Sequence, residues 1–372
     1  MKNDFKTPLS SIAGSNVFNF RELARKYKIE NKHKTNFYKA MAVSAIITLL
    51  SVFDRIRYSW LKKSYKSIEP PIFVLGHWRS GTTLLHNFMC LDPKAGYTTT
   101  YHTVFPQNIF GLQRLLKRAM HKAMPTHRPH DGLPIHPDNP QEEEFALSHI
   151  SSQGFYNWFY FAKNRKEFLE TLNNWEGLSA EKRQSWLLTY DTLVKRSLLD
   201  TGKKRYVSKN PANTFRIPQL LKLYPNAKFV YIYRNPYEVY PSSFGFFKSV
   251  ISTIGFHDIS DAEIKEFVLK VFRELVDKYE KDRSLIKKEN LIEIRYEDFI
   301  KSPASYLKQI YTQLELEITP ELEEKWNESE RKAKSHKTNR NNFDNDLVTE
   351  TNKYLADYIN KKGYNLPREK VS

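Results

Sequence analysis

Strand-like and helix-like patterns of apolar positions follow one another along most of the chain. Short segments that predict strands occur at 72–75, 205–207, 228–233 and 291–295. The segment 228–233 reads as a continuous apolar strand of the kind buried inside a parallel sheet. Apolar positions at helical spacing predict long amphipathic helices over 179–198, with Ser179 as N-cap, and over 264–279. Because strands and helices alternate, we expect an α/β fold with a mainly parallel sheet and helices on both faces.

Two stretches depart from this pattern. Residues 97–104 are rich in Thr and Tyr and predict a short extended segment. Residues 121–141 hold five prolines and four histidines and predict an irregular loop, which we interpret as a lid over a substrate site. The spacing of His121, His127, His130 and His136 is not typical of metal ligands, so no metal is expected.

No internal repeat or convincing linker divides the chain. We therefore expect a single domain over 70–372, with lid loops, behind a helical N-terminal extension over 1–69. The extension holds an apolar run, 41–53, that is well short of the roughly 20 residues that span a bilayer. Basic residues stand on both sides of this run: Lys32, Lys34, Lys39, Arg55, Arg57, Lys62 and Lys63. Residues 41–63 thus predict either a buried helix or one that lies on an anionic membrane surface.

The charge of the chain predicts an anionic partner. With 59 basic and 42 acidic side chains, the formal net charge is +17. Nucleic acid, anionic lipid and a polyphosphorylated cofactor would each fit, but the basic residues are scattered rather than gathered in one stripe, so nucleic acid is not expected. The single cysteine, Cys90, excludes an internal disulfide, and no secretory signal is visible. We expect a cytoplasmic protein, peripheral to the inner face of the membrane if 41–63 touches lipid.

A glycine-bounded loop follows the first predicted strand. Gly76-His77-Trp78-Arg79-Ser80-Gly81-Thr82-Thr83 has the glycine spacing of a Walker A loop, but Thr82 stands where a nucleotide triphosphatase has its lysine. Backbone N–H groups near Gly81 and the helix that begins near Thr82 can still hold an anion. Arg79 supplies the cation. Such a loop suits a phosphate and its substituent without the magnesium ion of triphosphate chemistry.

A second phosphate-type motif follows the strand at 228–233. Arg234 stands at the carboxyl end of this strand, where α/β folds bind ligands, and Ser242 follows eight residues later. An arginine forms bidentate pairs with phosphate, and a serine hydroxyl can add a further hydrogen bond.

Over about 70–303 the chain resembles the sulfotransferases that use 3'-phosphoadenosine 5'-phosphosulfate (PAPS), especially the bacterial and Golgi-type branches with Arg-Ser-Gly-Thr-Thr in their phosphosulfate loop. The resemblance implies a P-loop-type fold and PAPS as the donor, with no metal. It places Arg79, Ser80, Gly81, Thr82 and Thr83 at the 5' phosphosulfate, and Arg234 and Ser242 at the 3'-phosphate. It also suggests Lys337 and Arg340, in a basic loop near the C-terminus, as further contacts to the 3'-phosphate.

The resemblance further implies a lysine beside the sulfate, and Lys209 holds that place. We expect Arg79 and Lys209 to stabilise the charge that grows during transfer, with Asn210 as a further donor. In the cytosolic branch a histidine base follows the lysine, but here Asn210-Pro211 occupy its place. Two candidates for the base remain: Glu143, in a run whose Asn139, Pro140 and Glu142 can be explained as a helix cap, and His102. Glu143 is slightly preferred.

The acceptor is less determined. The aromatic run 155–161 is typical of a core, but rings lining a pocket would suit a flat apolar alcohol such as a sterol or lipid. A glycan is the main alternative, since aromatic rings also stack on sugars. A P-loop kinase would explain the fold, but this chain lacks the Walker lysine that such a kinase needs. A nucleic-acid or heparin-binding module would explain only the charge. The sequence predicts no oligomeric state.

Overall fold

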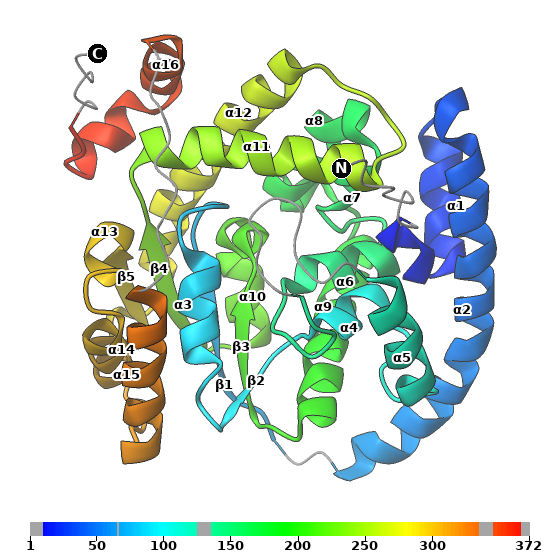
Figure 1. Cartoon of the computed structure of the whole chain (residues 1–372), viewed down its shortest axis with the longest axis horizontal. Helices are drawn as coiled ribbons and strands as arrows, with labels where there is room; N and C mark the ends of the chain where they lie inside the picture. The colour runs from blue at the N-terminus through cyan, green and yellow to red at the C-terminus, as the bar shows by residue number, and fades with distance from the viewer. Residues whose placement is uncertain (1–9, 65–66, 125–134, 335–344, 366–372) are drawn as a thin grey trace. The chain divides into compact units, whose positions relative to one another are not determined.

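The computed structural model shown in Figure 1 describes residues 10–64, 67–124, 135–334 and 345–365. The chain forms two compact units. The first takes its residues from Met1–Glu69, Gly96–Tyr206 and Phe246–Ser260, and the second from Pro70–Ala95, Val207–Gly245 and Asp261–Ser372. Residues 1–69 share the first unit with two later segments of the chain. A separate role for 1–69 stays a prediction.

The second unit carries the core of a five-stranded sheet with the strand order β2-β3-β1-β4-β5. The strands are β1 (Glu69–Leu75), β2 (Ala95–Gly96), β3 (Arg205–Lys209), β4 (Lys228–Tyr233) and β5 (Leu291–Arg295). β1 pairs with β4 in parallel, and β4 pairs with β5 in parallel. The four strands read from apolar runs are therefore confirmed, and so is the α/β class.

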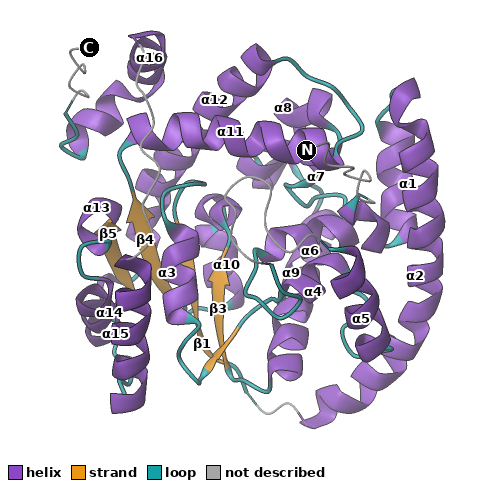
Figure 2. Ribbon diagram, viewed as in Figure 1, coloured by secondary structure: helices purple, strands orange, loops and turns teal. Residues whose placement is uncertain are grey.

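Helices of the second unit cover both faces of its sheet. They are α3 (Thr82–Met89), α10 (Ile217–Leu223), α12 (Asp261–Asp282), α13 (Tyr296–Phe299), α14 (Pro303–Gln313), α15 (Pro320–Lys334), α16 (Asn345–Lys361) and the first part of α11 (Pro236–Ile254). Alternate strand residues point to opposite faces. Ile72 and Val74 of β1 join a buried cluster with α3, α14 and α15, whereas Phe73 packs toward Tyr224 and Phe229. Figure 2 shows α3 lying over the strands.

Apart from the ends of β1, β2 and β3, the described residues of the first unit form helices and loops. Its helices are α1 (Val17–Lys26), α2 (Lys34–Leu61), α4 (Thr100–Val104), α5 (Gln113–Ala123), α6 (Glu143–Ile150), α7 (Asn157–Tyr160), α8 (Arg165–Asn173) and α9 (Ala180–Thr201). α9 begins as predicted, since the Ser179 side chain accepts a hydrogen bond from the Lys182 N–H.

The segment 97–104 is extended only in part. The N–H of Gln141 bonds to the carbonyl of Thr98, and Thr99 forms an antiparallel bridge with Pro140. From Thr100 the chain is helical instead, because Thr99 and His102 form a capping box at the start of α4. The prediction of an extended segment is wrong for 100–104, where this local cap outweighs the β propensity of Thr and Tyr.

Candidate functional site

The loop after β1 contains backbone conformations with positive φ, which glycine adopts more readily than other residues. Gly76 and Gly81 have φ values of 141° and 96°, and Arg79 has φ 66°, which is uncommon for a residue with a side chain. A Cβ on Gly76 would lie 2.3 Å from the carbonyl oxygen of Ile232 on β4. The N–H of Gly76 also donates to the hydroxyl of Thr214 at 3.0 Å. The loop is therefore fastened to the sheet before any ligand binds.

Ser80 helps to fasten this loop. Its hydroxyl donates to the carbonyl of His77 at 2.7 Å and lies 3.3 Å from the carbonyl of Ile232. The side chain is buried. The backbone N–H of Ser80 also donates to the His77 carbonyl. Ser80, which was predicted to contact PAPS, thus has both its hydroxyl and its N–H hydrogen-bonded within the protein.

The start of α3 has features that suit an anion. Gly81 is its N-cap, and no side chain caps the helix. The first N–H groups of a helix lack partners within it and carry the positive end of the helix dipole. Thr82 and Thr83 follow in the first turn, the former buried and the latter half-buried. This end of α3 fits a phosphate or sulfate group.

The structure brings the two phosphate-type motifs together. β1 and β4 are parallel neighbours, so Gly76 and Arg234 leave the sheet at the same edge. Nε of Arg79 donates to the hydroxyl of Ser242 on α11 at 2.9 Å, and a terminal nitrogen of Arg234 lies 3.4 Å from the carbonyl oxygen of Arg79. The sequence placed Arg79 and Ser242 at opposite ends of the donor, but here the Arg79 guanidinium extends toward the second motif.

Arg234 is supported by a ring that the sequence analysis did not select. Tyr233 on β4 is the register partner of Arg295 on β5, so Arg234 and Tyr296 follow at neighbouring strand ends. The guanidinium carbon of Arg234 lies 4.5 Å from the centre of the Tyr296 ring. The same ring fills the space beside Gly81, where a Cβ would come within 2.2 Å of it. The signal was the strand-end position of Tyr296, which becomes informative only once the strand order is known.

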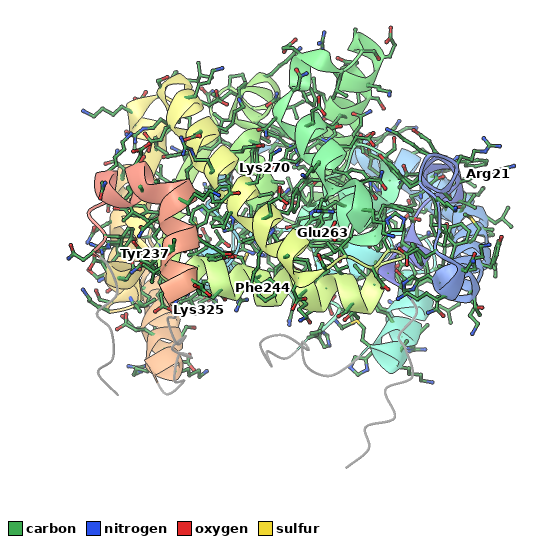
Figure 3. All side chains as sticks on the ribbon, turned by 90° about the horizontal axis from the view of Figure 1, so that it is seen from above. Arg21, Tyr237, Phe244, Glu263, Lys270 and Lys325 are labelled. Carbon is green, nitrogen blue, oxygen red and sulfur yellow. The ribbon has the colours of Figure 1, made fainter. Side chains whose placement is uncertain are left out.

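The turn after Arg234 is also fixed by side chains. Glu297 accepts a hydrogen bond from the N–H of Asn235 at 2.8 Å, and Asn235 accepts one from the N–H of Tyr237 at 3.1 Å. Tyr237, labelled in Figure 3, donates to Asn352 of α16 at 2.6 Å. Glu238, in the first turn of α11, has a carboxylate oxygen 3.7 Å from a guanidinium nitrogen of Arg234. An acidic residue thus helps to hold the cation in place rather than to bind the ligand.

Lys209 is buried at the end of β3, with a residual exposure of 2%. Its charge acts on His86 of α3, since burial first and then Lys209 lower the pKa of His86 to about 3. Asn210 has a local task, because its side chain accepts a hydrogen bond from the Ala212 N–H and caps the short turn Pro211–Phe215. The second unit therefore carries three cations of the predicted site, Arg79, Lys209 and Arg234.

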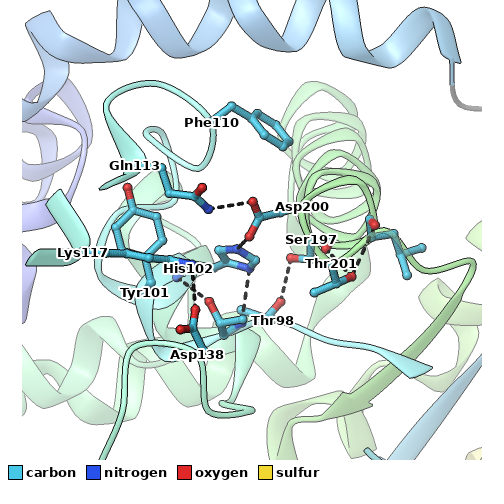
Figure 4. A network of polar contacts seen from close by, with 12 residues as sticks. Thr98, Tyr101, His102, Phe110, Gln113, Lys117, Asp138, Ser197, Asp200 and Thr201 are labelled. Carbon is cyan, nitrogen blue, oxygen red and sulfur yellow. Dashed lines mark hydrogen bonds and ion pairs between the residues drawn. The ribbon is translucent and has the colours of Figure 1, made fainter. Parts of the chain in front are cut away.

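His102, one of the two candidate bases, lies in a closed polar network of the first unit (Figure 4). Nδ1 accepts a hydrogen bond from the Thr99 N–H at 3.2 Å, so Nε2 carries the proton and donates to Asp200 at 2.8 Å. Burial raises the pKa of Asp200, but the hydrogen bonds from His102 and Gln113 outweigh it, and this pKa lies below its ordinary value. Both ring nitrogens of His102 are engaged, which disfavours a role as base.

Glu143, the other candidate base, opens α6 and is 1% exposed. It accepts a hydrogen bond from the hydroxyl of Tyr190 at 2.8 Å. The predicted helix cap at Asn139 and Pro140 is wrong: α6 starts at Glu143, because residues 139–141 bond to 98–100 instead. Glu142, the expected partner in that cap, accepts a hydrogen bond from the Tyr156 hydroxyl.

The remaining candidates have different outcomes. The aromatic run 155–161 is buried throughout, with at most 1% exposure for each residue, and packs as core. His121 lies on α5, and its ring is 5.7 Å from that of His136. Lys337, Arg340, His127 and His130 lie outside the residues that the structure describes.

Comparison with known proteins decides the family. The profile of the sulfotransferase family matches residues 70–320. The chain belongs to the sulfotransferase family. This confirms the prediction of a PAPS-dependent sulfotransferase that was based on the two phosphate-type motifs. The match covers the whole of both motifs and Lys209.

Individual relatives agree with this assignment. The omega-hydroxy-beta-dihydromenaquinone-9 sulfotransferase Stf3 of Mycobacterium bovis is 28% identical over 274 residues, 74% of this chain and 70% of that protein. The crystal structure of sulfotransferase STF9 from Mycobacterium avium has a TM-score of 0.64 at 17% identity, covering 98% of this chain and 99% of that one. Sulfotransferase STF1 of Mycobacterium tuberculosis has a TM-score of 0.60 at 19% identity, covering 85% and 88%. At these identities the two crystal structures show the fold.

Proposed function

We propose that this sulfotransferase moves a sulfuryl group from PAPS to a hydroxyl of a hydrophobic small molecule, a sterol or a lipid. The observation that carries the assignment of PAPS is the contact between the two phosphate-type motifs, with Arg79 hydrogen-bonded to Ser242 at 2.9 Å and Arg234 at 3.4 Å from the Arg79 carbonyl oxygen. These hydrogen-bond donors and cations offer two separate anion sites: the start of α3, and the group formed by Arg234, Arg79 and Ser242. A donor with a 5' phosphosulfate and a 3'-phosphate needs two such sites, so the residues fit it.

Different residues bind the sulfuryl group, bind the 3'-phosphate and accept the proton. The N–H groups at the start of α3 and the Lys209 ammonium stabilise charge on the sulfuryl and leaving phosphate oxygens. Arg234 and Ser242, with Arg79 extended toward them, hold the 3'-phosphate. The acceptor oxygen forms a bond to sulfur while the bond from sulfur to the phosphate oxygen breaks, and the electron pair leaves with adenosine 3',5'-bisphosphate. Glu143 takes the proton of the acceptor hydroxyl.

A relative supports the choice of a hydrophobic acceptor over a glycan. Stf3 is named as a sulfotransferase of omega-hydroxy-beta-dihydromenaquinone-9. The similarity to Stf3 runs over 74% of this chain and therefore reaches beyond the donor motifs. A hydrophobic alcohol is the acceptor class we assign to this chain as well.

We extend the proposal to the place of action, the cytoplasm at the inner face of the membrane, with contact through residues 41–63. The single Cys90 supports this location because the fold needs no disulfide. The net charge of +17 suits an anionic leaflet.

The function is tested by transfer from PAPS labelled with radioactive sulfur. The purified protein is incubated with the donor and, separately, with the lipid and carbohydrate fractions of a bacterial extract. We expect label in the lipid fraction, and a fall of at least about a hundredfold in rate for Lys209→Met, because a buried cation at the transferred group is lost. Lys222→Met, which removes an exposed lysine of α10, is the matched control and keeps the wild-type rate.

Two results would contradict the proposal. Label in the carbohydrate fraction alone would replace the acceptor class, and the assignment of the donor would stand. Full activity of Lys209→Met would remove this lysine from the transfer step.

A further inference from the structure

One face of α2 carries large apolar side chains that no other part of the described chain covers. Each is more than half exposed, from 51% for Val52 to 74% for Trp60. They are Tyr38, Ile46, Leu49, Val52, Phe53, Ile56 and Trp60. We call this set the α2 stripe. At about 100° per residue its members all fall within about one third of the helix circumference, and at about 1.5 Å per residue the stripe is about 33 Å long.

The opposite face of α2 is fixed to its own unit. The Ser44 hydroxyl donates to the Ser15 carbonyl at 2.7 Å, and the Asn108 amide donates to the Ile47 carbonyl at 3.1 Å. Asp54 is fully buried, accepts from the Phe110 N–H at 2.6 Å and forms an ion pair with Arg196. α2 runs along the edge of this unit beside α1 in Figure 1.

These attachments decide between lying on a membrane and crossing it. Asn31–Leu61 is, within the described residues, the one helix long and apolar enough to span a bilayer. A spanning helix would, however, have to place Asp54 at membrane depth. Its carboxylate is instead part of the protein interior, and only the α2 stripe is left to meet lipid.

Basic side chains border the stripe. Six are exposed and form no ion pair with any residue that the structure describes: Lys34, Lys39, Arg55, Arg57, Lys62 and Lys63. At 100° per residue, Lys39 and Arg57 lie along one border of the stripe, and Lys34 and Lys63 lie at its two ends. Tyr38 and Trp60, the side chains at the ends of the stripe, are of the kind that prefers the membrane–water interface.

We propose that the α2 stripe binds the surface of an anionic lipid bilayer, with α2 parallel to the membrane plane. The apolar side chains enter the acyl boundary and the six cations meet lipid phosphates. A second copy of the chain fits this face less well, because a symmetric contact would set the same cations against one another. The proposed function gives this contact a purpose, a hydrophobic acceptor dissolved in the membrane, but the geometry of α2 carries the inference.

The inference is tested by vesicle flotation of the full-length protein in the absence of donor. Vesicles of phosphatidylcholine are compared with vesicles that also contain phosphatidylglycerol. We expect the protein to float with the anionic vesicles and less so at high salt. The triple variant Leu49→Gln/Phe53→Gln/Ile56→Gln should bind about tenfold or more weakly, because three inserted side chains become polar. Lys39→Glu/Arg57→Glu should weaken binding to anionic vesicles alone.

A matched control replaces exposed leucines elsewhere. Leu188 and Leu285 are 57% and 55% exposed, and Leu188→Gln/Leu285→Gln should float like the wild type. Absence of flotation, or equal flotation of the triple variant, overturns the inference. So does a wild-type dimer that the triple variant converts to a monomer without vesicle binding, since a second copy would then cover the stripe. A chain that transfers sulfuryl but does not float refutes this inference and the membrane contact of residues 41–63, and leaves the transfer reaction standing. A chain that floats without transfer refutes the proposed reaction and leaves this inference standing.

Discussion

At the scale of single residues, Tyr296 links the two halves of the donor site. Its ring lies under Arg234 at 4.5 Å and closes the space beside Gly81. One side chain therefore sets both the position of a phosphate-binding cation and the packing of the phosphate loop. Tyr296 acts through Arg234 and Gly81, so we regard it as a positioning residue.

Replacing the Tyr296 ring should weaken binding of adenosine 3',5'-bisphosphate. Tyr296→Leu loses the cation–π contact, worth about 1–2 kcal/mol, and we expect a rise of about tenfold in Kd measured by calorimetric titration. Tyr296→Phe keeps the ring and should bind like the wild type. Arg234→Ala should bind more weakly than either. Equal affinities for Tyr296→Leu and Tyr296→Phe would show that the ring does not position Arg234.

At the scale of elements, the strands and long helices could be predicted because their patterns are local. β4 and β5 have the bounds that the apolar runs indicated, and α9 has the predicted cap. α2 could not be bounded from its apolar run 41–53, since the helix continues to Leu61 through alternating basic and apolar residues. The predicted start of α6 was wrong for another reason. Residues 139–141 form hydrogen bonds with the distant segment 98–100, and a local cap pattern carries no information about such contacts.

The turn from β1 into α3 should tolerate no side chain at Gly81. Gly81→Ala meets both a φ of 96° and the Tyr296 ring, so we expect bisphosphate affinity to fall by more than about tenfold together with a lower Tm. Gly245→Ala is the matched control within α11, where an added Cβ meets nothing within 4 Å. It should leave affinity unchanged and stabilise the helix by about 0.5–1 kcal/mol, measured by urea unfolding. An unaffected Kd in Gly81→Ala would remove the helix start from the donor site.

At the scale of the whole molecule, the donor site was more predictable than the base. The residues of the phosphate loop and of the Arg234 motif follow strand ends, so sequence order alone places them at one sheet edge. His102 and Glu143 lie in the other unit, and their partners Asp200 and Tyr190 come from the distant helix α9. Whether His102 or Glu143 is held in a closed hydrogen-bond network depends on these tertiary contacts, which the spacing of residues along the chain does not predict.

Buried histidines should lower the free energy of unfolding of the whole molecule as the pH falls into the mildly acidic range. Burial lowers the pKa of His77 and His86 to about 3 and that of His149 to about 4, against 6.5 in an exposed histidine. Below pH 6.5 the unfolded chain therefore binds protons that the folded chain does not, and the free energy of unfolding falls as pH falls. Between about pH 7.5 and about pH 5.5 each histidine removes a little more than about 1 kcal/mol, so the three together remove about 4 kcal/mol.

This loss would be a large share of a typical stability of about 5–15 kcal/mol, and it can be measured by urea unfolding at both pH values. His149→Gln should lower stability at the higher pH, because the hydrogen bond of 2.8 Å between its ring and the Tyr160 hydroxyl is lost. The same variant should reduce the pH-dependent loss by about a third, because one of the three buried histidines is removed. His121→Gln, at an exposed position on α5, removes no buried ring and should keep the wild-type loss. A loss that is the same in all three proteins would mean that His149 is protonated in the folded state, and that burial does not keep it neutral.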